Sequence, residues 1–282
     1  MNDLIAELLL IRKRAAIWIM LGFWTLMSLL FSYILPYYAF TSGISLHERG
    51  AGFLLLIALL PRNLLSNITA GFPFFGGIFA LVVGVLVMGS EFSWGTLTPV
   101  FTQRSSRLKV FFSKMLALGI TLIPFLLSVF ILGLAASLMI AWREGQSLAL
   151  PPLFELVKTL GACWLILAVW SSFGVLLAVI SRGTALAIGL GIIYGLVLES
   201  IISAFGREVD LLNQIAKAFL RTNSYSLISS LGVSIQAEGG PGGFIGPRLS
   251  GTESLIVIVC YVGLFLGVAG WLLRQRDVAG LG

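Results

Sequence analysis

Long apolar stretches separated by short polar ones dominate this sequence. An α-helix needs about 20 apolar residues to cross the ~30 Å hydrocarbon layer of a bilayer, because its backbone must satisfy its own hydrogen bonds there. Six stretches are long enough, at residues 16–36, 68–89, 115–141, 154–180, 184–205 and 253–273. The pattern predicts an all-α polytopic membrane protein with six transmembrane helices, numbered one to six below, in a single domain over residues 1–282.

Two shorter stretches before helix two have a helical or apolar pattern but cannot span a membrane. Residues 1–14 place Leu4, Leu8 and Ile11 on one helical face, which predicts an interfacial elbow helix lying in the membrane surface. Residues 51–60 are apolar but are followed directly by a proline and an arginine. We expect this stretch to be interfacial or re-entrant.

The loop between helices five and six, residues 206–252, contains a further amphipathic pattern. Within residues 208–221, Leu212, Ile215 and Phe219 fall on one face, and an acidic start and basic end complement the helix dipole. This pattern predicts one helix that packs flat against the outer end of the bundle and buries these three side chains.

The composition excludes a soluble protein and argues against several activities. Hydrophobic residues make up 58% of the 282 residues, charged residues only 11%, and the mean hydropathy is +1.03, whereas soluble domains carry about 25% charged residues. The net charge of +6 comes mainly from residues between apolar runs, so nucleic acid is not an expected partner.

No phosphate-binding loop, catalytic constellation or metal-ligand spacing is present. We therefore expect no enzyme activity, metal or cofactor in this chain. We also expect Cys163 and Cys260 to be buried as small apolar residues.

Lysine and arginine in the short loops set the expected orientation, because positive residues collect on the cytoplasmic side. They cluster at residues 12–14, 104–114 and 274–276. On the opposite side they are diluted over longer loops and mixed with acidic residues. The distribution predicts that both termini are cytoplasmic.

The segment between helices two and three, residues 90–114, carries the strongest functional signal. It is long for a turn and amphipathic, and its notable residues are Glu91, Gly95, Thr96, Arg104, Arg107 and Lys114. Glu91 is either a carboxylate that pairs with a neighbouring Arg or Lys, or a contact that fixes a coupling segment. Glycine followed by threonine permits a bend and then a helix cap. The basic residues are either membrane anchors or contacts to a partner.

The spacing Glu-x3-Gly-Thr-x10-Arg-x6-Lys resembles the signature of type-2 ABC transporter permeases, on Glu91, Gly95, Thr96, Arg107 and Lys114. The sequence departs from that signature at Arg104, where the family usually has proline. The six-helix layout and the ending at residues 274–278 are also similar to that family.

The resemblance implies the permease subunit of an ATP-driven exporter in the plasma (inner) membrane of a prokaryote. Two permease chains, identical or related, would form the translocation path, and separate ABC ATPase subunits would bind ATP and Mg and dock on residues 90–114. Surrounding lipid is the other expected contact. The alternative is a non-transport membrane scaffold or assembly subunit. The sequence does not indicate the substrate.

Glu199, inside helix five, is the remaining candidate site residue. Ionisable groups at membrane depth often mark a transport pathway, but one near a helix end is more often interfacial, and both interpretations stay open. Small residues predict close helix contacts on helices two and five, which are the candidates for lining the path: Gly76, Gly77, Gly84, Gly189, Gly191 and Gly195. Glu155 and Lys158, one helical turn apart, are expected to pair.

Overall fold

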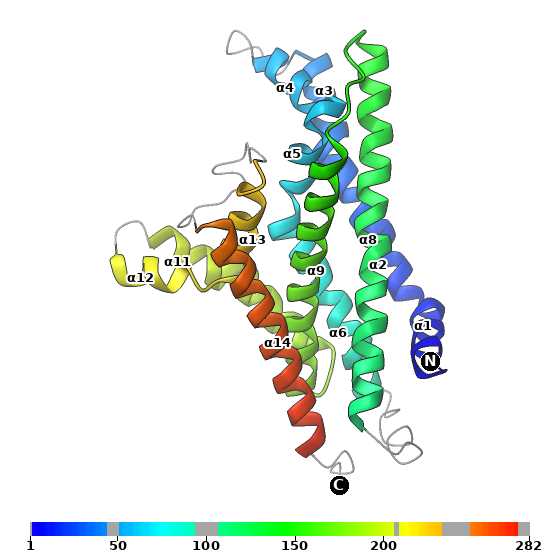
Figure 1. Cartoon of the computed structure of the whole chain (residues 1–282), viewed down its shortest axis with the longest axis vertical. Helices are drawn as coiled ribbons and strands as arrows, with labels where there is room; N and C mark the ends of the chain where they lie inside the picture. Colours follow the sequence, from blue (N-terminus) through cyan, green and yellow to red (C-terminus); the bar gives the residue numbers. More distant parts are fainter. Residues whose placement is uncertain (1, 44–50, 94–106, 206–208, 233–248, 276–282) are drawn as a thin grey trace.

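The computed structural model describes residues 2–43, 51–93, 107–205, 209–232 and 249–275, and the elements that it assigns there are all helical (Figure 1). In chain order they are α1 (Asn2–Lys13), α2 (Ala15–Leu29), η1 (Leu30–Ile34), α3 (Leu35–Thr41), α4 (Ala51–Leu59), η2 (Pro61–Asn63), α5 (Leu64–Thr69), η3 (Phe72–Gly76), α6 (Gly77–Ser93), α8 (Arg107–Arg143), α9 (Leu153–Ser181), α10 (Ala185–Ile192), η4 (Ile193–Leu198), α11 (Glu199–Phe205), α12 (Asp210–Ala216), α13 (Leu220–Ser229) and α14 (Gly251–Gln275).

The prediction of six membrane-spanning helices is confirmed by length and apolar character. In the described parts of the chain, the spans are Ala15–Thr41, Phe72–Phe92, Leu108–Arg143, Leu153–Ser181, Ala185–Ile202 and Gly251–Gln275. They correspond in order to the six apolar stretches. Helix α1 and the end of α14 lie toward the same end of the elongated bundle (Figure 1).

The expected interfacial or re-entrant segment before helix two is helical and bent. Gly52–Leu59 and Pro61–Thr69 together are apolar and long enough to span, but they meet at an angle of 73°. The extended backbone of Leu60 and the proline after it account for the break, because proline cannot continue the hydrogen-bond ladder of the preceding helix. A broken span or a re-entrant loop both fit this geometry.

Helix two is the most enclosed of the spans, and it packs tightly on α9. A Cβ atom added to Gly84 would lie 2.1 Å from the backbone oxygen of Ser171, and one added to Gly174 would lie 2.2 Å from that of Leu81. The two helices therefore approach backbone to backbone, and each supplies a glycine to the crossing. Gly77 and Gly191 make the predicted close contacts, while Gly189 has no atom near enough to require a glycine.

Three spans contain a π-helical turn, namely η1, η3 and η4 in helices one, two and five. The turns in helices one and two are neighbours, because the rings of Phe31 and Phe75 stack at 6.1 Å. The amide of Asn67 donates to the backbone oxygen of Ser32 inside η1. A backbone carbonyl of the π-helical turn is thus hydrogen-bonded by a side chain of a neighbouring helix. Such bonds allow irregular helices to exist inside a membrane.

Two expectations of local structure are wrong. Residues 208–221 form no single helix, because the chain breaks after α12 and restarts at α13; Phe219 is buried but Ile215 is exposed. Within the expected coupling segment 90–114, α6 continues to Ser93 and α8 begins at Arg107, and residues 94–106 lie outside the described part. Finally, Cys163 is buried as expected but Cys260 is exposed.

Candidate functional site

A buried cluster of charged side chains joins three helices at the end of helix two. The ammonium group of Lys114, in α8, donates to Glu7 Oε2 of α1 at 2.6 Å and to Glu91 Oε1 of α6. Lys114 is 2% exposed, and Glu7 and Glu91 are each 8% exposed. The desolvation of three charges is costly unless they are closely paired and hydrogen-bonded, and this cluster meets that condition.

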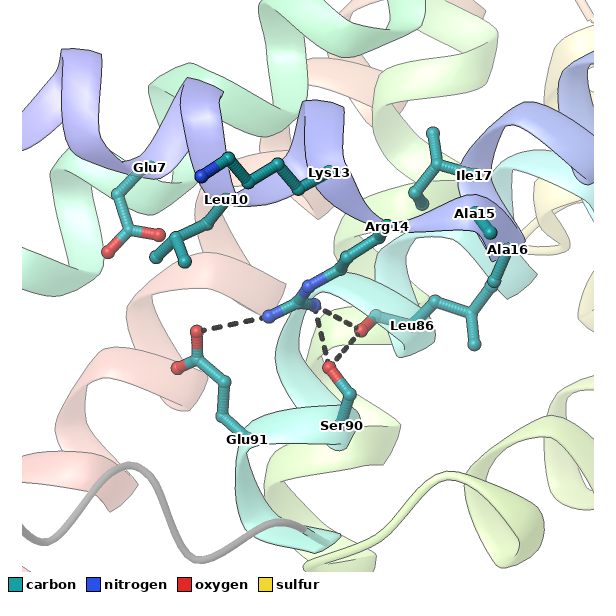
Figure 2. A pocket seen from close by; sticks show the side chains of 10 residues that line it. All are labelled: Glu7, Leu10, Lys13, Arg14, Ala15, Ala16, Ile17, Leu86, Ser90 and Glu91. Carbon is teal, nitrogen blue, oxygen red and sulfur yellow. Dashed lines mark hydrogen bonds and ion pairs between the residues drawn. The ribbon is translucent and has the colours of Figure 1, made fainter.

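Arg14 extends the cluster from the point where α1 ends and α2 begins. Its Nη1 donates to Ser90 Oγ at 2.6 Å and to the backbone oxygen of Leu86 at 2.9 Å, and its Nη2 lies 3.5 Å from Glu91 Oε1 (Figure 2). The backbone of Arg14 is extended (φ −82°, ψ 107°), which separates the two helices and lets its side chain reach α6. Four charged groups from α1, the α1–α2 junction, α6 and α8 thus form one connected network.

A cavity of about 670 Å³ opens beside this network (Figure 2). It is lined by Glu7, Leu10, Lys13, Arg14, Ala15, Ala16, Ile17, Leu86, Ser90 and Glu91. Most of its surface is apolar, and its charged groups gather on one side. A volume of this size lies within the range of sites for small organic ligands, which is roughly 300–1,000 Å³.

Of the six predicted coupling residues, Glu91 and Lys114 have side chains in the described part of the structure, and it brings these two together. Glu91 and Lys114 are in direct contact, so the interpretation of Glu91 as the partner of a nearby cation is confirmed. Arg107 is the first residue of α8, and its side chain is outside the described part. Gly95, Thr96 and Arg104 also lie outside the described residues.

Sequence reasoning missed Glu7 and Arg14 as members of the cluster. Glu7 falls between Leu4 and Ile11 at spacings of three and four residues, which is the spacing of one helical face. A carboxylate inside the apolar stripe that includes Ile11, which is itself buried, is the signal that could have identified a buried ion pair.

Glu199 caps a neighbouring helix. It is fully buried, its Oε1 accepts the backbone N–H of Leu220 at 3.1 Å, and its Oε2 accepts that of Arg221 at 3.1 Å. The Nε of Arg221 lies 3.8 Å from the same carboxylate, and its Nη1 donates to Ser200 Oγ. The carboxylate satisfies the unpaired N–H groups in the first turn of α13 and balances the positive end of its dipole. This explains its burial; a pathway role for Glu199 stays a prediction.

Helix α13 is polar in sequence and nevertheless buried. All of residues 220–228 are buried, including Thr222, Asn223 and Ser224. The amide of Asn223 donates to the backbone oxygens of Lys217 and Phe219, and so closes the break between α12 and α13. Helix α13 thus packs against α14, α9 and η3 although its surface is polar.

The other predicted ion pair is confirmed. Lys158 Nζ lies 3.4 Å from Glu155 Oε2, as expected, with both side chains more than a third exposed. Among the described residues, no group of three or more His, Cys, Asp and Glu side chains has the arrangement of a metal site.

Comparison with known proteins corrects the resemblance to type-2 ABC transporter permeases. A family model described as "Protein of unknown function (DUF2705)" matches residues 65–279, which is more than half of the chain. The chain is also 23% identical, over 224 residues, to the "Uncharacterized protein YhcI" of Bacillus subtilis (strain 168); the match covers 75% of this chain and 67% of that protein. The assignment to the ABC permease family is therefore wrong: these matches are to proteins of unknown function, and no ABC transporter family is among them.

Proposed function

This chain belongs to the DUF2705 family of unknown function, and from its own residues we propose that it is the membrane-spanning subunit of an ATP-driven export complex. ATP and Mg are bound by a separate ATPase subunit. That subunit acts on the segment between α6 and α8. The observation that supports this proposal is the buried network of Glu7, Arg14, Glu91 and Lys114.

The network supports the proposal because of what it connects. Glu91 lies at the end of α6 and Lys114 lies two turns into α8, so the two residues flank the segment 94–106 along the chain. Their contact ties the ends of helices two and three to each other, and Glu7 ties both to α1. A force applied by a soluble partner to this segment is therefore delivered to three helices together. Because α6 also meets α9 backbone to backbone, the displacement continues into helix four.

The transport part of the proposal is supported by polar groups inside the bundle. Polar and ionisable residues at membrane depth face protein or water and often belong to pathways. Glu199, which lies inside the fifth span and pairs with Arg221 of buried α13, is such a residue. We propose that two copies of the chain, or this chain and a related one, form the path at their interface. In the proposed topology both termini are cytoplasmic, α1 lies in the membrane interface, and the membrane is the plasma (inner) membrane of a prokaryote.

Co-purification tests the proposal most directly. The affinity-tagged chain is purified from its native host under mild detergent, and ATPase activity and protein composition are measured. We expect an ATPase subunit in stoichiometric amount. Glu91→Gln and Arg107→Ala should reduce its recovery, because both change the ends of the docking segment.

The matched control is Lys158→Gln, which removes a charge from an exposed pair and should leave recovery unchanged. Size-exclusion profiles of all three variants establish that the chain itself is folded. Purification of the wild-type chain with no ATPase, under conditions that preserve its oligomer, would contradict the proposal and favour the scaffold alternative.

A further inference from the structure

The cavity beside Arg14 lies where the chain is expected to meet the surface of the membrane. Helix α1 buries Ile11 against the core and leaves Ile5, Leu9 and Leu10 about half exposed. At the start of α2, Trp18 is also half exposed, and its indole nitrogen donates to the backbone oxygen of Arg12 at 2.7 Å. Tryptophan beside basic residues at the start of a membrane span marks the level of lipid headgroups.

The lining of the cavity has two chemical parts. Ala15, Ala16, Ile17 and Leu86 give it an apolar wall from α2 and α6. Figure 2 shows Glu7, Lys13 and Glu91 on the opposite side, with Leu10 among them. An amphiphile with a charged head and an apolar tail matches this division better than a small soluble ion does.

The charge of the site selects an anionic head. The carboxylates of Glu7 and Glu91 both accept hydrogen bonds from Lys114, which is not itself a lining residue. The charged lining residues are two cations, Lys13 and Arg14, and these two carboxylates. Because Lys114 and Arg14 balance the two carboxylates, Lys13 remains as the excess positive charge. Lys13 is exposed, whereas Lys114 is buried. The side chain best placed to meet a ligand is therefore cationic.

We propose that this cavity binds one anionic phospholipid, with the phosphate held by Lys13 beside Arg14 and an acyl chain along Ala16 and Leu86. The lipid fills the space between α1 and α2 and so braces α1 against α6. This binding does not depend on the proposed transport function. A chain that carries no ATPase would bind the lipid equally.

Native mass spectrometry of the purified full-length chain in detergent tests the proposal. Phosphatidylglycerol and phosphatidylcholine with identical acyl chains are titrated separately, and inorganic phosphate is added as a competitor. We expect one phosphatidylglycerol to be retained in preference to phosphatidylcholine. Lys13→Gln should weaken its apparent affinity roughly fivefold, because one lysine near an anionic lipid contributes about that factor.

A second variant tests the apolar wall. Ala16 is exposed, so Ala16→Trp should be tolerated while its indole occupies the cavity, and retention of phosphatidylglycerol should be lost. Lys158→Gln removes the same charge at a distant exposed position and should retain the lipid as the wild type does. Equal retention of the two lipids, undiminished binding in Lys13→Gln, or displacement of the lipid by millimolar phosphate would each overturn the proposal; the last would identify a site for soluble phosphate.

Discussion

Replacing Lys114 with methionine should destabilise the protein strongly, because it removes the only ammonium group that the structure shows bonded to both carboxylates of the cluster. Lys114 is nearly inaccessible and donates to Glu7 and Glu91. Truncating one partner of a buried ion pair typically costs about 3–5 kcal/mol, since the remaining charge stays desolvated. We expect Lys114→Met to lower the free energy of unfolding by about this amount, measured by SDS titration in mixed micelles.

The chain provides its own control for this prediction. Lys158 pairs with Glu155 through a longer contact of 3.4 Å, and both side chains are more than a third exposed. An exposed pair contributes about 0–1 kcal/mol, so Lys158→Met should have a small effect. Adding Glu7→Gln and Glu91→Gln to Lys114→Met should recover at least half of the loss, because no carboxylate is then left buried without its ammonium. Equal losses in Lys114→Met and Lys158→Met would refute the reasoning that the cluster is a desolvated network.

Other expected outcomes follow from single contacts. Gly84→Ala should cost about 1–3 kcal/mol of unfolding free energy through overpacking, because its Cβ would lie 2.1 Å from a backbone oxygen; Gly189→Ala, with open space around it, should be neutral or slightly stabilising in the same assay. Glu199→Leu should increase hydrogen exchange in α13, measured by mass spectrometry, because a lost cap costs about 0.5–2 kcal/mol; unchanged exchange would contradict the capping role. In a cysteine-free background, an impermeant thiol reagent should label Ser147→Cys in intact cells but not Gln275→Cys, and the reverse pattern would invert the topology. The purified chain alone should hydrolyse no ATP, and turnover that follows the chain through every purification step would contradict this.

The sequence predicts the transmembrane helices well because lipid imposes one strong rule on them. A span must be long, apolar and helical, so the composition of each stretch is enough to locate it. The sequence also predicts that Glu91 pairs with a nearby Arg or Lys, since two opposite charges at the ends of neighbouring spans have few other partners. The contact with Glu7 was missed because it joins residues 107 positions apart, and no local pattern reports such a distance.

The region around α13 shows where sequence patterns fail. Residues 208–221 have a helical period, but the Glu199 carboxylate offers its oxygens to the N–H groups of Leu220 and Arg221, and a new helix begins there. Arg221, expected at the basic end of a helix, instead lies in a first turn and pairs with Glu199. The polar side chains of α13, such as Asn223, are buried by tertiary packing against α14 and α9, which periodicity does not record.

The long separation of Glu7 from Lys114 has a consequence for biosynthesis. Helix α1 leaves the ribosome before α8 does, and the ammonium group that holds it is made 107 residues after Glu7, which at ~5–20 residues per second is a delay of roughly 5–20 s. During that interval Glu7 has no contact with Lys114. Docking of α1 on Lys114 therefore requires that α8 has been synthesised, and a chain truncated before Lys114 would leave α1 without this contact and open to proteolysis.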